Sequence, residues 1–373
     1  MILLIKNANI FSPIPLGIQS VLVINQKIVQ IAPVIQLGTF PENQVTTIDL
    51  QGLTLTSGFI DQHIHLMGAG GKNGFSSMTQ ELNTQDLFNV GTTTAVGLLG
   101  TDGSTKSIRS LYAKVMSMRE QGLNTFMHTG YYGIDPVHVT DSIQDDLVFI
   151  EPILGCKIAI SDIRSSYPTD LELLRILRAV RTGGLIAKKK GIMHVHLGAL
   201  PTMMDPLFRL HRDHGFPIEH ISPTHVGRTA ELFDQAIEFA RLGGSIDITT
   251  GASKFTDPYK CAIQAFESGI DFSLVTFSTD GNAGLDKKDE NGNVIGTKPA
   301  DIGANLKEVQ ALINSGFPVE NALKTVTTNP AKNLGLNSKG QIAVGFDADF
   351  CIFNNQWKLE STISQGTLNK PIA

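Results

Sequence analysis

The sequence predicts an α/β protein: a (β/α)₈ TIM-like barrel with a small β-sandwich domain built from both ends of the chain. Two observations predict this fold. From residue 58 onward apolar strands alternate with helical stretches, whereas both chain ends contain strands and turns. Alternating strands and helices require a parallel sheet, and eight strands is the number at which the common barrel closes. A chain of 373 residues, 42% of them hydrophobic, can supply a core for both parts.

The small β-domain is expected from residues 1–55 and 340–373. Strand-like composition occurs at residues 3–10, 20–24, 27–31 and 46–49, with Pro13, Pro15, Pro33 and Gly38 as turn residues. Residues 340–353 again alternate between strand and turn. Neither end can enclose a core alone, so we expect the C-terminus to return to the N-terminal strands.

The barrel is expected to span residues 56–339. Its eight strands are predicted at residues 59–66, 93–99, 125–129, 153–160, 192–197, 221–226, 245–249 and 273–278. Helical periodicity occurs between these strands, as at 171–180 and 229–240, and after the last of them at 305–315 and 319–327. An open doubly wound sheet is the alternative, but no glycine-rich nucleotide fingerprint follows the first strand.

Charge and cysteine content exclude several classes of protein. A net charge of −5 does not favour nucleic acid or an anionic membrane as a partner, so small molecules are the expected ligands. Three scattered cysteines are too few for a disulfide framework. The apolar start of the chain meets Lys6 too soon for a signal peptide, and no apolar run is long enough for a membrane helix. We therefore expect a cytoplasmic protein.

Polar side chains mark the carboxyl ends of several predicted strands, where barrel enzymes carry their chemistry. His63 and His65 end the first strand and, two residues apart, face the same side. His196 ends the fifth strand, His225 the sixth, and Asp280 follows the eighth. Each alone could be a hydrogen-bonded histidine or a helix-capping aspartate. Four imidazoles and a carboxylate at one barrel mouth together predict a divalent-metal site.

Lys157 lies inside the apolar stretch of the predicted fourth strand. A lysine pointing into a barrel is unfavourable unless it is paired or chemically altered. The alternative is that its amine extends to the surface.

The complete set resembles the amidohydrolase superfamily over nearly the whole chain: HxH on strand one, lysine on four, histidines on five and six, aspartate on eight. Within that superfamily the sequence is most similar to the isoaspartyl dipeptidases, or β-aspartyl peptidases. The stretches that carry the similarity are GFIDQHIHL at 58–66, GLLGTD at 97–102, KIAISDIRS at 157–165, PTHVGR at 223–228 and GGSIDIT at 243–249. The resemblance implies a metallopeptidase with a binuclear centre.

The resemblance also implies how the metals are held. Lys157 would carry CO₂ as a carbamate whose oxygens bridge two divalent ions, with zinc expected first. One ion would be held by His63, His65 and Asp280, the other by His196 and His225, with a hydroxide between them. Two cations would lower the pKa of the bound water towards neutrality. Asp280 would then take the hydroxide's proton and deliver it to the leaving amine.

Further positions match the family's substrate site. Tyr132 matches a tyrosine that donates a hydrogen bond to the tetrahedral oxygen, and its neighbour Tyr131 is expected to pack. Arg164 and Arg228 match arginines that bind carboxylates through a bidentate fork, although an isolated arginine can equally be a surface charge. Positions that would line the pocket are Gly70 and Thr101.

Two positions depart from the family's pattern. Lys72 stands where the family has a glutamate for the substrate's α-ammonium, and Gly284 stands where it has a serine. A cation about 4 Å from an ammonium group near a protein surface is unfavourable by roughly 4 kcal/mol. Either Lys72 turns away and Asp102 or another acid takes its place, or the substrate has a neutral or anionic group there.

The expected function is therefore hydrolysis of an amide bond in a small substrate that bears carboxylates, with β-aspartyl dipeptides first. N-acyl amino acid deacylation or cyclic-amide hydrolysis on the same site is the second expectation. A metal-binding scaffold without catalysis is the third, although Asp280 and Tyr132 would serve no purpose in it. The resemblance also suggests a homo-oligomer.

Overall fold

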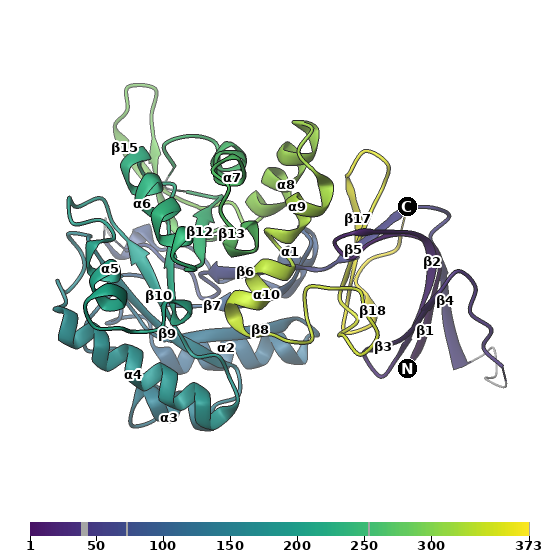
Figure 1. Ribbon diagram of the computed structural model, residues 1–373, viewed down its shortest axis with the longest axis horizontal. Coiled ribbons are helices and arrows are strands. Elements are labelled where there is room, and N and C mark those ends of the chain that lie inside the picture. The colour runs from purple at the N-terminus through teal and green to yellow at the C-terminus, as the bar shows by residue number, and fades with distance from the viewer. Residues whose placement is uncertain (39–43, 72–73, 253, 373) are drawn as a thin grey trace.

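The structure is a computed structural model that describes residues 1–38, 44–71, 74–252 and 254–372. Figure 1 shows a large part, in which helices surround strands, and beside it a smaller part made of strands. Both termini lie in the smaller part. No helix within the described ranges has both the length and the apolar character required to cross a bilayer.

The larger part is a barrel of eight parallel strands. In chain order these are β6 (Phe59–Ile64), β7 (Thr92–Gly97), β8 (Asn124–Gly130), β9 (Ile153–Ile160), β10 (Ile192–Leu197), β11 (Ile221–Thr224), β12 (Ile246–Thr249) and β13 (Val275–Ser278). Each strand pairs with its neighbour in sequence. The ring closes beside β6, where Ile64 bridges to Gly281 and the His65 N–H donates to the Gly281 carbonyl at 2.9 Å. The predicted barrel is confirmed and the open sheet is excluded.

Helices cover the outside of this barrel because each has one apolar face. They are α1 (Thr84–Phe88), α2 (Ile108–Glu120), α3 (Ile143–Phe149), α4 (Asp170–Ala187), α5 (Asp205–Arg212), α6 (Ala230–Arg241), α7 (Pro258–Glu267), α8 (Ala304–Asn314), α9 (Val319–Lys324) and α10 (Thr328–Leu334). In α4, Thr169 and Glu172 form a capping box, and Leu173, Leu177 and Val180 are buried. Thus local capping and apolar periodicity agree on where this helix begins and which face it buries.

The smaller part is a sheet of strands from both chain ends. Its members are β1 (Ile2–Phe11), β2 (Pro15–Ile24), β3 (Lys27–Ala32), β4 (Val45–Asp49), β5 (Thr54–Ser57), β16 (Phe350–Phe353), β17 (Leu359–Ser364) and β18 (Thr367–Leu368). The order is β18-β17-β16-β5-β1-β2-β3, with β4 also paired to β1. Ile5 and Ile10 from one end share a core with Phe350 and Ile352 from the other. The expected return of the C-terminus is confirmed.

A hairpin that was not predicted from the sequence follows β13. It consists of β14 (Gly284–Lys288) and β15 (Val294–Pro299), which pair in antiparallel fashion. Asn291 and Gly292 lie in its turn, where the Asp289 carboxylate accepts hydrogen bonds from the Asn291 and Asn293 backbones. An Asn-Gly pair is a strong hairpin signal and could have located this element. Gly284 and Leu285 of β14 line the same cavity as Asp280, so the hairpin forms part of the wall of the site.

Candidate active site

The six predicted ligands meet at the carboxyl ends of the barrel strands. His63 Nε2 lies 3.2 Å from Lys157 Nζ and 3.3 Å from Asp280 Oδ1. His65 Nε2 lies 3.1 Å from the same Asp280 oxygen. Ligand atoms of His63, His225 and Asp280 are all within 4.8 Å of one another. His196 joins them from β10, because its ring centroid is 4.4 Å from that of His225.

Backbone strain accompanies two of these residues. His225 and Asp280 each follow the end of a strand, and their φ angles are +65° and +50°. Non-glycine residues seldom occupy this left-handed region, and those that do cluster at functional sites. The turn immediately after the strand is therefore part of what directs the two side chains toward the centre.

Burial determines the protonation state of the predicted nitrogen ligands. Lys157 is completely buried, and this burial lowers the pKa of its ammonium to about 7. Burial likewise lowers the pKa of His196 to about 3 and holds those of His63 and His225 well below the ordinary histidine value. At neutral pH these imidazoles are uncharged, and each has a lone pair available for a cation.

Asp280 is the negative charge at the centre. Burial opposes its ionisation, but hydrogen bonds from His63 and His65 outweigh this effect and hold its pKa well below the ordinary value. The Nδ1 atom of His65 is buried and has no hydrogen-bond partner among the described residues. Neutral imidazoles, a carboxylate and an amine that is readily neutralised are a donor set that fits divalent cations such as zinc.

Three of the predicted histidine ligands each contact a further polar side chain, for which the sequence analysis predicted no role. His63 Nδ1 is 2.9 Å from His194 Nε2, and His225 Nδ1 is 2.6 Å from Thr249 Oγ1. His196 Nε2 is 2.9 Å from Asp162 Oδ2. Such contacts fix the tautomer and the ring orientation of a metal ligand. The sequence carried a signal for His194, since it precedes His196 by two residues and faces the same side.

A buried polar chain continues below the centre. Starting from His194, the connected side chains are Ser222, Asn333, Gln62 and Asp247. The Asp247 carboxylate also accepts hydrogen bonds from Thr224 at 2.6 Å and Ser278 at 2.5 Å. These contacts join β6, β10, β11, β12, β13 and α10 beneath the predicted ligands. We infer that this chain fixes the barrel strands relative to one another.

His128 stacks on His194 in this region, with ring centroids 5.1 Å apart and an interplanar angle of 17°. It is fully buried, and neither ring nitrogen has a hydrogen-bond partner among the described residues. Burial, aided by the nearby Lys157 ammonium, lowers the pKa of His128 to about 3, although the Gly155 backbone acts in the opposite direction. The folded protein therefore holds this imidazole in its neutral form.

This neutral imidazole predicts a pH dependence of stability. Between pH 6 and 4 the unfolded chain binds a proton at His128 that the folded protein does not, so this residue's contribution makes the free energy of unfolding fall as pH falls. We expect His128→Leu to remove about 1.4 kcal/mol per pH unit from the slope of that free energy in the metal-free protein. Denaturant unfolding of the wild type and the variant at pH 6, 5 and 4 measures this slope. Identical slopes for both proteins would contradict the prediction.

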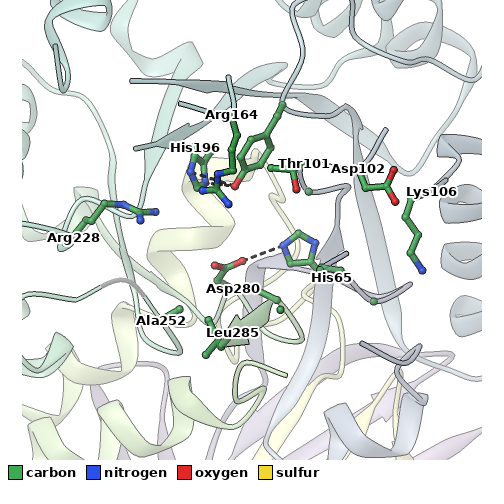
Figure 2. Close-up of a pocket in the computed structure, with 17 residues that line it drawn as sticks. His65, Thr101, Asp102, Lys106, Arg164, His196, Arg228, Ala252, Asp280 and Leu285 are labelled. Atoms are coloured by element: carbon green, nitrogen blue, oxygen red, sulfur yellow. Dashed lines mark hydrogen bonds and ion pairs between the residues drawn. The ribbon is translucent and has the colours of Figure 1, made fainter. Parts of the chain in front are cut away.

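A cavity of about 190 Å³ opens above Asp280 and His65. All the described residues predicted to contact substrate line it: Gly70, Thr101, Tyr132, Arg164 and Arg228. Figure 2 shows Arg164 beside His196, with Arg228 to the left of them and Asp280 below. Lys72, the remaining predicted contact, lies outside the described residues.

The two arginines and Tyr132 have different partners. Arg164 pairs with Asp162 through Nε at 2.9 Å and Nη2 at 2.6 Å. Arg228 donates from Nε to the Leu197 carbonyl at 3.0 Å, and within the part of the chain that the structure describes its terminal nitrogens remain available for another partner. The Tyr132 hydroxyl lies 2.7 Å from His196 Nδ1, and burial raises its pKa well above the ordinary tyrosine value. Tyr132 is therefore a protonated donor beside a predicted metal ligand.

Two details bear on the positions that depart from the family pattern. A Cβ atom on Gly284 would lie 2.7 Å from the Gly70 Cα, so the loop around Gly70 leaves no room for a serine there. Asp102 lines the cavity, but its carboxylate accepts hydrogen bonds from the Ser104 and Thr105 backbones. Asp102 is thus engaged within its own loop.

Comparisons with known proteins agree with this geometry. The model of the amidohydrolase family matches residues 187–371. The crystal structure of a β-aspartyl dipeptidase from Fervidobacterium islandicum AW-1, in complex with β-Asp-Leu, is 39% identical, with a TM-score of 0.92 over 99% of this chain and 96% of that one. A deacetylase from Brucella anthropi is 24% identical over 340 residues, which cover 87% of this chain and 78% of that protein. The fold is shared by a dihydropyrimidinase from Brevibacillus agri NCHU1002. Its structure is 18% identical in sequence, with a TM-score of 0.67 over 100% of this chain and 96% of that one.

Proposed function

The chain belongs to the amidohydrolase family, and from this premise we propose that it is a metal-dependent β-aspartyl dipeptidase. The observation that carries the proposal is the convergence of His63, Lys157 and Asp280, with Nε2–Nζ and Nε2–Oδ1 separations of 3.2 and 3.3 Å, below a cavity lined by two arginines. The similarity to an enzyme crystallised with β-Asp-Leu supports the choice of substrate.

We propose that two divalent ions, zinc in the first instance, occupy this centre. His63, His65 and Asp280 would hold one ion and His196 and His225 the other, with Lys157 contributing to both as a carbamate. Carbamate formation requires the neutral amine, and a pKa of about 7 makes that form abundant at neutral pH. Such ions supply a water of lowered pKa and polarise the scissile carbonyl.

The chain's own residues supply the remaining chemistry. Asp280 is ionised, so one of its oxygens can accept the proton of the attacking water and pass it to the leaving nitrogen. The terminal nitrogens of Arg228 have no hydrogen-bond partner among the described residues and can bind a substrate carboxylate, and Arg164 lines the same cavity. Tyr132, protonated and buried, can donate to the oxygen that becomes negative as the carbonyl is attacked.

Tyr132→Phe tests the last of these roles. We expect kcat for β-Asp-Leu to fall about 100- to 1,000-fold, the typical effect of losing one oxyanion donor. The KM should change little if the phenol acts mainly in the transition state. Steady-state kinetics at equal metal content measures both values. Tyr131→Phe is the matched control, and equal losses in the two variants would contradict the assignment.

A second candidate is hydrolysis of an N-acylated amino acid or a cyclic amide in the same cavity. Two observations favour it: a lysine occupies position 72, and the carboxylate of Asp102 is already engaged. A panel of β-Asp-Leu, N-acetyl-β-Asp-Leu and a hydantoin, assayed at fixed metal content, separates the two candidates. Faster hydrolysis of β-Asp-Leu supports the dipeptidase.

The Lys72→Glu variant makes the second candidate testable on this chain. If the wild-type substrate carries no free amine, the glutamate should raise kcat/KM for β-Asp-Leu at least about tenfold, because it replaces repulsion with attraction. The N-acetyl substrate should gain nothing. High wild-type activity on β-Asp-Leu, with no gain in the variant, would eliminate this candidate.

We also propose that the protein works in the cytoplasm as a homo-oligomer. Support for a reducing compartment comes from Cys156, Cys261 and Cys351, which are buried and unpaired. Exposed apolar side chains in and beside β2, such as Ile14 and Ile18, support self-association. Light scattering on the purified protein tests the oligomer.

A further inference from the structure

Asp162 touches both halves of the proposed site. It lies two residues after β9 and is 5% exposed. One carboxylate oxygen, Oδ2, is 2.9 Å from His196 Nε2 and 2.6 Å from Arg164 Nη2. The other, Oδ1, accepts from the Arg164 Nε and backbone N–H, both at 2.9 Å. A predicted metal ligand and a predicted substrate-binding arginine thus share one buried carboxylate.

The backbone conformation around Asp162 allows the contact between Asp162 and His196. Ser161, just before Asp162, has a φ of +54°. A Cβ atom on Gly198 would lie 2.1 Å from the Ser161 carbonyl oxygen and 2.4 Å from the Asp162 Cα. Only glycine at the end of β10 permits so close an approach. The glycine therefore allows the Asp162 loop to lie against the end of the strand that carries His196.

The contact with His196 decides where the imidazole proton lies. The Tyr132 hydroxyl lies 2.7 Å from His196 Nδ1 and 3.2 Å from Nε2, whereas Asp162 Oδ2 lies 2.9 Å from Nε2. A carboxylate beside Nε2 favours the tautomer with the proton on Nε2. The lone pair is then on Nδ1, which can accept from the Tyr132 hydroxyl in this structure and would be the nitrogen offered to a cation in the centre.

The contact with Arg164 decides the orientation of the guanidinium. Its side chain is 45% exposed, so without a partner it would sample many rotamers. Asp162 engages Nε and one Nη2 hydrogen, and no other described residue takes the two Nη1 hydrogens or the second Nη2 hydrogen, which remain for a further acceptor. Because Arg164 lines the cavity, these remaining N–H groups are available to a substrate there.

We propose that Asp162 is a positioning residue that serves the metal centre and carboxylate recognition at once. It holds His196 in the tautomer that ligates through Nδ1 and fixes Arg164 for a substrate carboxylate. This inference rests on the proposed function. A conservative substitution should separate the two tasks, because they need different properties of the side chain: His196 needs an acceptor, and Arg164 needs the negative charge.

The test compares three variants of the full-length, zinc-loaded protein. For Asp162→Ala we expect zinc affinity, measured by competition with a chromogenic chelator, to fall about 10- to 100-fold, and the KM for β-Asp-Leu to rise at least about tenfold. For Asp162→Asn we expect zinc affinity within about threefold of wild type, since the amide oxygen still accepts from Nε2, but a raised KM. Arg164→Gln is the matched control, with a raised KM and wild-type zinc affinity.

Two results would overturn the proposal: wild-type zinc affinity in Asp162→Ala, or an equal loss of affinity in Arg164→Gln. Circular dichroism of the metal-free proteins checks folding. If Asp162→Ala does not fold, Asp162→Asn decides, and an unchanged KM in that variant refutes the link to Arg164. Lack of wild-type activity on β-Asp-Leu would instead refute the proposed substrate, while the zinc measurements would still test the link to His196.

Discussion

Asp280→Asn is expected to lower kcat for β-Asp-Leu at least about 1,000-fold, because it removes two properties of one side chain. The carboxylate is the negative charge that His63 and His65 both approach, at 3.3 and 3.1 Å. It is also the group proposed to move a proton, a role that typically contributes 100- to 10,000-fold. An amide keeps the size of the side chain but cannot accept a proton.

The measurement is kcat at matched zinc content, since zinc loss alone would also lower activity. Asp289→Asn, the same change in the exposed turn of the β14–β15 hairpin, is the control and should retain wild-type kcat. An Asp280→Asn variant that holds zinc and remains within tenfold of wild-type kcat would exclude proton transfer by Asp280. Loss of activity confined to the zinc-depleted variant would assign Asp280 to metal binding alone.

The proximity of the predicted ligands could be inferred from the sequence, because in a barrel the position of a residue along its strand determines where its side chain lies. A residue at the carboxyl end of any strand faces the same mouth, so His63, His196 and Asp280 were expected to meet despite wide separation in the chain. In the structure the ring of His63 lies 5.0 Å from that of His225, 162 positions later. Strand periodicity and strand order were sufficient for this prediction.

The polar groups that contact the predicted ligands were harder to predict. Asp162 lies in a loop after β9, and its contact with His196 depends on the positive φ of Ser161 and on the close approach at Gly198. Neither feature follows from periodicity. The polar residues Gln62 and Asn333 meet inside the barrel because α10 packs beneath β6, and this depends on tertiary packing that no local pattern encodes. The β14–β15 hairpin was missed because neither of its strands has a buried face: β14 is partly exposed and β15 is mostly exposed.

Lys157→Met is expected to have the second large effect, with opposite consequences for function and stability. The kcat for β-Asp-Leu should fall at least about 1,000-fold, and the zinc content should decrease, because the variant lacks the side chain proposed to contribute to both ions. Stability of the metal-free protein should rise. A fully buried ammonium with a pKa of about 7 destabilises the fold at neutral pH, whereas methionine fills a similar volume without charge.

The pH dependence of the free energy of unfolding distinguishes the removal of a buried ammonium from simple misfolding of the variant. Between pH 7 and 10 the unfolded chain binds a proton at Lys157 that the folded protein releases, so wild-type stability should increase with pH by about 1.4 kcal/mol per unit from this residue. Lys157→Met lacks this contribution. Its advantage over the metal-free wild type should therefore be greatest near pH 7 and shrink towards pH 10.

Denaturant unfolding of both proteins in CO₂-free buffer measures this difference. Lys189→Met is the control, because Lys189 Nζ donates to the carbonyls of Leu147, Ile150 and Ile153, and its loss should destabilise the fold. If Lys157→Met is less stable than the metal-free wild type at pH 7, the buried amine is held by favourable contacts in the folded protein. It would then not be poised to lose its proton and take up CO₂, and the proposed carbamate would lose its physical basis.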